Sequence, residues 1–256
     1  MLVCAAGDIH GAINRFYGDV LAFEQTLGAA FDWVLRVGDF GIWPDPARID
    51  RATRNHGGAG GFRDWFAARR EVLRRTVFIK GNHEDFEWLE SRNGSQLLPE
   101  LVYLRNGCRI DLHGGTDEKI SVGGVGGCYG ASVYRRDAKA LQGYASRHYT
   151  HDEVDRLSRL GALDVVLTHD APAGIQLPHR RRGVGYVSEA AGIDVLLSRV
   201  RPRVCFFGHH HARVDADIAG VRCVGLNKVA CPGNLIAMEL DRNGRGCALV
   251  GEYGAQ

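Results

Sequence analysis

Short apolar runs alternate with amphipathic stretches through most of the chain. Residues 2–6 (LVCAA) form an apolar run that indicates a buried strand, and residues 12–28 carry apolar side chains at helical spacing. Further strands are predicted on the same grounds at 33–37, 77–80, 164–168 and 203–207, and further helices at 62–73, 84–91, 150–160 and 188–200. Alternation of strands with helices is typical of an α/β protein.

Two segments carry additional local signals. Thr150 opens the predicted helix 150–160, and Glu153 follows three residues later, which is the pattern of a capping box. Residues 101–123 indicate two or three consecutive strands, because turn residues interrupt the apolar pattern at 106–107 (NG) and 114–115 (GG).

The pattern changes after residue 211. Short strands follow without helices, in the segments VDADI, VRCVG, NLIAMEL and CALVGEY. An alternating region that gives way to strands alone predicts a sandwich of two sheets with the helices outside. No linker and no internal repeat divides the sequence, so we predict one domain over residues 1–256.

Composition restricts the class of protein. Of the 256 residues, 45% are hydrophobic and 24% charged, with a net charge of +2, as in a globular chain with a sizeable core. So small a net charge argues against a dedicated nucleic-acid binder, and a polyanionic partner would have to contact a local patch. The seven cysteines contain no C-x-x-C pair, and neither a signal peptide nor an apolar run of about 20 residues is present. We therefore expect a cytoplasmic protein that does not enter membranes.

Two stretches, residues 41–61 and 126–148, do not fit the periodic pattern. Both are long, weakly periodic and rich in glycine and polar residues. Loops of this length inside a compact domain are usually functional or mobile.

Polar motifs follow the predicted strands. They read GDIHG (7–11), GDF (38–40), GNHE (81–84), THD (168–170) and GHHH (208–211). Functional sites in open α/β sheets form at the carboxyl ends of strands, so these loops can converge.

The residue types in these motifs point to a metal site. In extended chain, residues two apart lie on the same side, which groups Asp8 with His10 and His209 with His211, and turns His210 away. Carboxylate, amide and imidazole donors without a thiolate suit divalent ions such as Mn²⁺, Fe²⁺ or Zn²⁺. No cysteine falls within the motifs, which argues against a structural zinc finger.

In this order the motifs resemble the signature of the calcineurin-like metallophosphoesterase superfamily, and its phosphodiesterase-type branch in particular. The resemblance spans roughly residues 7–211 and implies a four-layer αββα sandwich of two mixed β-sheets flanked by helices, with a dinuclear metal site at the strand ends. It implies one metal held by Asp8, His10, Asp39 and His211, and a second held by Asp39 as a bridge together with Asn82, His169 and His209.

The activity implied by this resemblance is hydrolysis of a phosphodiester, derived from a nucleotide or a nucleic acid. The attacking group would be a hydroxide that bridges two divalent ions about 4 Å apart. Mn²⁺ is the ion we expect, with Fe or Zn as alternatives. Asp39 and His83 are the predicted catalytic residues, and His83 would stabilise phosphate charge or protonate the leaving oxygen. The sequence GDFGIWP lacks the arginine that follows the second motif in the protein-phosphatase branch, which argues against that activity.

Other candidates concern the surroundings of the metals. The predicted substrate contacts are Asn82, His83, Trp43 and Arg181. Trp43 either stacks on a base or belongs to the core. Arg181, in the run 180–182, either binds phosphate or is part of a solvated surface. His56 belongs either to a lid or to a solvated loop.

Two acidic residues follow motif histidines. Asp170 follows His169, and Glu84 follows His83. Each carboxylate either orients an imidazole or is an exposed charge at the start of a helix.

Two other functions stay open at this point. One is a phosphomonoesterase for a small metabolite, and the other is a non-catalytic scaffold of the same fold that binds protein partners. A scaffold is expected to have lost ligands or the histidine that faces the substrate, whereas all of these residues are present. The sequence does not indicate an oligomeric state.

Overall fold

The computed structural model describes residues 1–92, 96–115, 118–178, 184–241 and 246–254. Its α-helices are α1 (Ile13–Leu27), α2 (Gly61–Ala67), α3 (Phe86–Glu90), α4 (His151–Ser158) and α5 (Ile193–Val200). Its 3₁₀-helices are η1 (Pro46–Arg48), η2 (Thr53–Asn55), η3 (Ala138–Ala140) and η4 (Gly143–Arg147). Its strands are β1 (Leu2–Ala6), β2 (Trp33–Arg36), β3 (Thr76–Phe78), β4 (Gln96–Leu98), β5 (Leu101–Tyr103), β6 (Cys108–His113), β7 (Lys119–Val125), β8 (Val165–Thr168), β9 (Gln176–Leu177), β10 (Tyr186–Val187), β11 (Val204–Phe207), β12 (Val214–Ile218), β13 (Val221–Gly225), β14 (Leu235–Leu240) and β15 (Cys247–Glu252).

The strands form two large mixed sheets and a short hairpin. The first sheet has the order β15-β14-β1-β2-β3-β5-β4, and the second has the order β12-β13-β11-β8-β7-β6. In the first sheet β1, β2 and β3 are parallel, while β14 pairs with β1 in the antiparallel direction. In the second sheet β7, β8 and β11 are parallel. The strands that precede the polar motifs are therefore parallel neighbours within each sheet.

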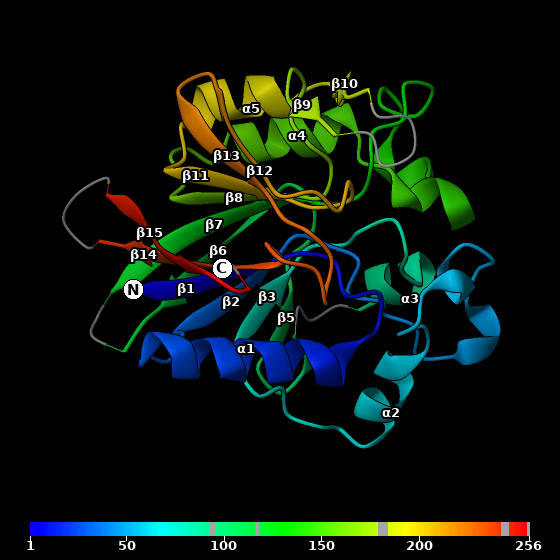
Figure 1. Cartoon of the computed structure of the whole chain (residues 1–256). Helices are drawn as coiled ribbons and strands as arrows, with labels where there is room; N and C mark the ends of the chain where they lie inside the picture. The colour runs from blue at the N-terminus through cyan, green and yellow to red at the C-terminus, as the bar shows by residue number, and fades with distance from the viewer. Residues whose placement is uncertain (93–95, 116–117, 179–183, 242–245, 255–256) are drawn as a thin grey trace.

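The two sheets pack face to face between outer helices, which gives four layers (Figure 1). Apolar side chains of both sheets fill the space between them. Helix α1 covers the outer face of the first sheet, and α4 and α5 cover the outer face of the second. The predicted αββα sandwich of two mixed sheets is confirmed.

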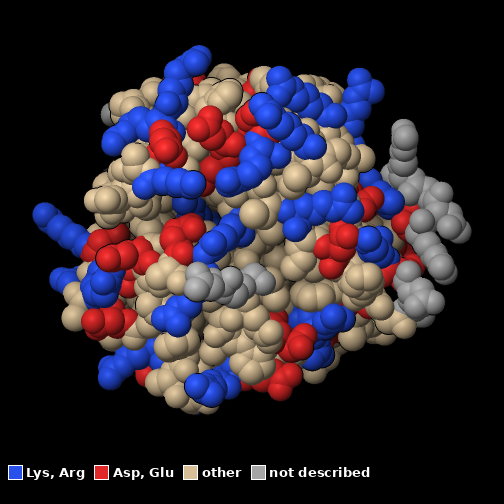
Figure 2. Space-filling view, turned by 180° about the vertical axis from the view of Figure 1, so that it is seen from behind, with Lys and Arg blue, Asp and Glu red and all other residues tan. Residues whose placement is uncertain are grey.

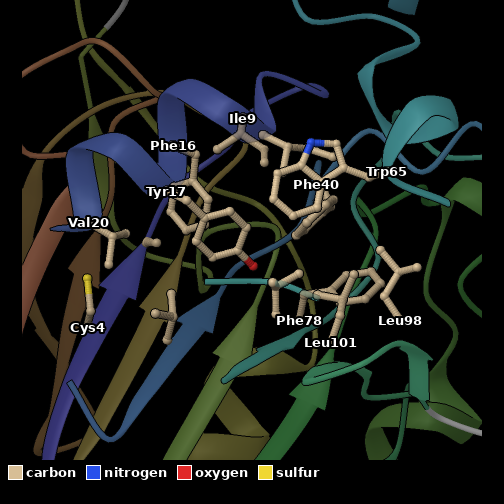
Figure 3. Packing of buried hydrophobic residues seen from close by; sticks show 14 of the residues in the cluster. Cys4, Ile9, Phe16, Tyr17, Val20, Phe40, Trp65, Phe78, Leu98 and Leu101 are labelled. Carbon is tan, nitrogen blue, oxygen red and sulfur yellow. The ribbon is translucent and has the colours of Figure 1, made fainter. Parts of the chain in front are cut away.

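The layer beneath α1 anchors the loops that carry the motifs. Phe16 and Tyr17 of α1 point into a cluster that also contains Phe78 of β3 (Figure 3). Ile9 and Phe40, which adjoin two of the predicted metal ligands, belong to the same cluster and are 1% and 0% exposed. Burial of a side chain of this size contributes about 1.5–3 kcal/mol, so the core itself holds these loops in place.

Local sequence explains one helix start. The predicted capping box of α4 is confirmed: the Thr150 backbone N–H donates to the Glu153 carboxylate at 2.8 Å, and the Thr150 side chain accepts in return from the third helical residue. This arrangement satisfies backbone donors that the first turn leaves unpaired.

Two helices are shorter than the periodicity predicts. Helix α2 ends at Ala67 and not at residue 73, because Arg69 adopts a left-handed φ of 47°. Helix α5 begins at Ile193 and not at residue 188, because Gly192 before it has a φ of 92° and residues 186–187 pair with β9 instead. Apolar spacing continued across both breaks, so the pattern alone could not locate them.

The surface carries charges of both signs. On the face opposite to that of Figure 1, Lys and Arg side chains intermingle with Asp and Glu side chains (Figure 2). Among the helices in the described part of the chain, none combines the length and the apolar character needed to cross a bilayer. That residues 1–256 form one domain stays a prediction, which the shared core between the sheets supports.

Candidate functional site

The polar motifs meet at one end of the sandwich. Asp8 and His10 follow β1, Asp39 follows β2, and Asn82 follows β3, all in the first sheet. His169 follows β8, and His209 and His211 follow β11, in the second sheet. Contacts cross between the sheets here: the His209 backbone N–H donates to Asp8 Oδ2 at 2.9 Å. All the predicted ligand positions are therefore neighbours in space.

One group of donor atoms gathers around Asp8. Single donor atoms of Asp8, His10, Asp39 and His211 all lie within 4.8 Å of one another. His211 Nε2 is 3.1 Å from both Asp8 Oδ2 and His10 Nε2, and His10 Nδ1 is 3.6 Å from Asp39 Oδ2.

A second group lies on the other side of Asp39. His169 Nε2 is 2.9 Å from Asn82 Oδ1 and 3.6 Å from Asp39 Oδ2. The His209 ring is 5.0 Å from the His169 ring, centroid to centroid. Asp39 Oδ2 thus lies at 3.6 Å from an imidazole nitrogen of each group, while Asp39 Oδ1 accepts backbone N–H groups of Asn82 and His83 at 2.8 and 2.9 Å.

The backbone conformation at these ligands differs from the extended conformation that the sequence predicted. His10, Asp39, His209 and His211 have φ values of 48°, 43°, 63° and 50°, so the GDIHG, GDF and GHHH motifs contain left-handed residues and are not extended chain. The argument from strand alternation is therefore wrong, although Asp8 and His10 do meet, while His209 and His211 lie in different groups. Each such conformation costs a non-glycine residue about 1–2 kcal/mol, which the surrounding core offsets.

A glycine before one ligand allows the loops after β2 and β3 to approach closely. A Cβ atom on Gly81 would overlap the carboxylate and backbone nitrogen of Asp39. Any side chain at this position would push the Asn82 loop away from Asp39. The glycine of the GNHE motif is therefore required by close approach.

Burial and charge in the centre favour the metal-binding forms of Asp8, Asp39, His10 and His209, but not of His169. Burial raises the pKa values of Asp8 and Asp39, but histidine neighbours outweigh it and hold both pKa values below the usual range. Burial lowers the pKa of His10 and of His209 to about 4, so both rings are neutral at pH 7. Burial also lowers the pKa of His169, but the charges of Asp39 and Asp8 outweigh burial and raise this pKa above its usual value.

Two unpaired atoms test whether a cation fits. Asp8 Oδ1 and His10 Nδ1 are buried and make no hydrogen bond within the described residues. A buried polar atom without a partner costs about 1–3 kcal/mol, and a cation bound by these side chains would offset part of this cost. Carboxylates with neutral imidazoles and an amide are suitable ligands for divalent first-row metals. The residues present fit divalent metal ions.

Comparison with known proteins agrees with this geometry. Residues 1–213 match the family model described as calcineurin-like phosphoesterase. The chain belongs to the calcineurin-like phosphoesterase family. The predicted resemblance is confirmed, and with it the prediction of a metal-dependent phosphoester hydrolase.

Relatives of this phosphoesterase are similar over most of its length. The lariat debranching enzyme of Entamoeba histolytica is 21% identical over 93% of the chain and 72% of its own length. The lariat debranching enzyme of Drosophila melanogaster is 24% identical over 84% of the chain, which spans only 44% of that relative. By name both relatives are enzymes, which agrees with the prediction that this chain is one.

Solved structures share the fold at low identity. A putative 5′-nucleotidase from Staphylococcus aureus has a TM-score of 0.52 at 13% identity, with 97% of the chain and 52% of that protein covered. GAP50, an anchor in the inner membrane complex of Plasmodium, has a TM-score of 0.55 at 11% identity, with 95% and 82% covered. These similarities show the fold alone.

His83 of the phosphoesterase is held from two sides. Its ring Nδ1 is 2.9 Å from the hydroxyl oxygen of Thr53, which is fully buried. Its backbone carbonyl accepts the indole N–H of Trp43 at 3.0 Å. With Nδ1 engaged by Thr53, the other nitrogen of the ring is left for the substrate. Thr53 was not predicted, since a single threonine in an aperiodic loop carries no sequence signal.

Trp43 and Arg181 were predicted to contact the substrate. Trp43 is 5% exposed and packs behind His83, so stacking on a base would require the indole to leave this position. Its contact with substrate stays a prediction. Arg181, with Arg180 and Arg182, lies outside the described residues.

We expect replacement of Thr53 by valine to lower kcat/KM for a phosphodiester about 10-fold, because His83 loses the partner that fixes its ring. Valine has nearly the shape of threonine, so metal content and melting temperature should not change. Thr53→Ser, which restores a hydroxyl, should recover the rate. Thr26→Val, on the exposed side of α1, serves as the matched control. Steady-state kinetics and elemental analysis of the metal measure the outcome. A Thr53→Val protein with the wild-type rate would show that Thr53 does not position His83 for catalysis.

Glu84 is buried and does not touch an imidazole. Its carboxylate accepts the backbone N–H groups of Phe40, Gly41 and Ile42 at 2.8, 3.1 and 2.6 Å. Burial and the charge of Asp39 raise the pKa of Glu84 to about 8. Glu84 therefore fixes the loop that follows Asp39, and it is not the exposed helix-start charge of the second interpretation.

Asp170 does contact an imidazole, but not that of a predicted ligand. Its Oδ1 is 2.8 Å from His210 Nε2, and His210 Nδ1 is 2.7 Å from the hydroxyl of Tyr186. The pKa of Asp170 falls to about 2 against the effect of burial, chiefly because of the hydrogen bond with His210. The middle histidine of the GHHH motif thus links the metal-site loops to strand β10.

Proposed function

We propose that this phosphoesterase hydrolyses phosphodiester bonds of nucleic-acid origin, with branched RNA as its substrate class. The proposal of a nucleic acid rests on its similarity to lariat debranching enzymes, at 21% and 24% identity for the two relatives described above. The observation that carries the hydrolytic part is the position of Asp39 Oδ2, at 3.6 Å from an imidazole nitrogen in each of two donor groups.

In this proposal the centre holds two divalent ions, with Mn²⁺ as the resident metal. The first would be held by Asp8, His10, Asp39 and His211, and the second by Asp39, Asn82, His169 and His209. When bound, such ions activate water and neutralise charge on phosphoryl oxygens. A carboxylate that faces both groups at once supports sharing of Asp39.

The chain's own side chains would orient the substrate. His83, fixed through Nδ1 by Thr53, would donate a hydrogen bond from Nε2 to a phosphoryl oxygen or pass its proton to the leaving oxygen. Asn82 would lie beside the same phosphate. The seven cysteines are free, which supports our further proposal that the protein acts in the cytoplasm.

Two substrate pairs test this function with the Mn²⁺-loaded protein. We expect bis-p-nitrophenyl phosphate to be hydrolysed at least about tenfold faster than p-nitrophenyl phosphate, because the centre would act on a diester. We also expect a branched oligoribonucleotide to be cleaved at its branch in preference to a linear one of the same composition.

The results separate the candidate functions. Hydrolysis of the monoester alone would replace the proposal by a phosphomonoesterase. Equal cleavage of branched and linear RNA would keep the phosphodiesterase and remove the branched substrate. Full metal occupancy without hydrolysis of any of the four compounds would contradict the proposal and favour a binding role.

A further inference from the structure

A glycine-rich segment, residues 56–61, lies beside the candidate site. It packs backbone against backbone on the turn that carries Asp8 and His10. A Cβ atom on Gly58 would overlap the backbone of Gly11 and Ala12, so only glycine permits this approach. Hydrogen bonds within the segment, from Ala59 N–H to the His56 carbonyl at 3.1 Å among them, keep it compact.

The packing of this segment places His56 over the metal-site residues. The His56 ring stacks on the ring of His10, with centroids 3.6 Å apart and planes 12° apart. The His83 ring meets it edge-on at 4.9 Å. His56 is half-buried, so one face lies on a predicted ligand while part of the ring remains open to solvent.

The ring nitrogens of this cluster are close together. One nitrogen from each of His10, His56 and His83 lies within 4.8 Å of the other two. None of the hydrogen bonds among the described residues engages the His56 ring, whereas His83 Nδ1 is held by Thr53. His56 therefore has a donor to offer at the place where the substrate's phosphate would lie.

The spacing suits a shared oxygen atom. Two N–H···O hydrogen bonds of about 2.9 Å that meet near the tetrahedral angle place their nitrogens about 4.7 Å apart. We propose that His56 and His83 together bind one phosphoryl oxygen of the substrate, so that His56 is a phosphate-binding residue of the active site. This inference rests on the proposed phosphoester hydrolysis. His56 would also supply a hydrogen-bond donor to the phosphate in a centre whose second motif, GDFGIWP, has no arginine.

Binding of inorganic phosphate tests the inference without turnover. Calorimetry would compare the Mn²⁺-loaded wild type with His56→Ala and His56→Phe, since phenylalanine keeps the stack on His10 and removes both nitrogens. We expect the phosphate dissociation constant to rise about 10- to 100-fold in both variants, the range of a lost hydrogen bond to a charged group. The kcat/KM for bis-p-nitrophenyl phosphate should fall to a similar extent. Asn55→Ala, an exposed neighbour in the same loop, should match wild type in both measurements.

Metal content separates the roles of His56. Weaker phosphate binding in both variants at unchanged metal stoichiometry supports the proposal. Wild-type phosphate binding by His56→Phe would overturn it, because His56 would then act only by packing. Loss of metal from both variants would also overturn it, because His56 would act through His10. If wild type binds phosphate through His56 but hydrolyses no phosphoester, the proposed function fails while the binding site stands.

Discussion

Replacement of Asp39 by asparagine is expected to lower kcat/KM for a phosphodiester by about a thousandfold or more, as for loss of a group that stabilises charge in a water-excluded site. The amide can still accept the backbone N–H groups of Asn82 and His83, which Asp39 Oδ1 now accepts at 2.8 and 2.9 Å. The charge at Oδ2 is lost, and in our proposal that atom serves both metals. Kinetics with bis-p-nitrophenyl phosphate, together with metal analysis of the purified variant, measure the effect.

The same variant should fold normally. Asp8 and Asp39 are buried carboxylates, and each disfavours the charge of the other. The attraction of His169 and His10 nevertheless outweighs this repulsion and burial, because the Asp39 pKa lies below its usual range, so loss of the charge in the metal-free state should lower the melting temperature modestly. Asp152→Asn, on the exposed surface of α4, is the matched control for a neutralised carboxylate. An Asp39→Asn protein as active as wild type would refute the assignment of this residue.

Removal of metal is expected to abolish hydrolysis completely and to lower the melting temperature. At a metal concentration of 100 times the dissociation constant, binding stabilises the native state by about 2.7 kcal/mol, which corresponds to a shift of about 5–10 °C in a domain of this size. Dialysis against a chelator, followed by kinetics and calorimetry, measures both changes. Addition of Mn²⁺ should restore both the activity and the melting temperature. Parallel additions of Fe²⁺ and Zn²⁺ at the same concentration would show whether either ion restores them better.

The Asp39→Asn protein also provides the control for this experiment. Its melting temperature should respond less to Mn²⁺ than that of wild type, because a shared ligand has been weakened. Full activity in the chelated wild type, with metal shown to be absent, would contradict a metal-dependent centre.

The sequence predicted the fold and the loops that converge because both depend on short-range patterns. Buried parallel strands appear as continuous apolar runs, and a polar motif after each run indicates where the sheet ends. The reason given for the pairing of Asp8 with His10 was nevertheless wrong. Left-handed φ values at His10 and His211 depend on the packing of the surrounding loops, which spacing does not encode.

What the sequence did not predict lies mainly in the aperiodic stretch 41–61. Thr53 and His56 contact His83 and His10 because their loop packs on the turn of the first motif, and neither residue belongs to a strand end. His56 was interpreted as part of a lid or of a solvated loop. Strands β9 and β10 have two residues each, which is too short for any alternation to be visible. Contacts between loops that are distant in the sequence leave no local pattern from which they could be predicted.

The pairing of β1 with β14 has a consequence for synthesis of the protein. Leu2 lies opposite Glu239 in this pair, so the strand that leads to Asp8 gains its second neighbour only after residue 240 has left the ribosome. Until then β1 has an open edge, and contacts this distant along the chain form late. The first sheet, which positions Asp8, is therefore completed only when synthesis is nearly finished.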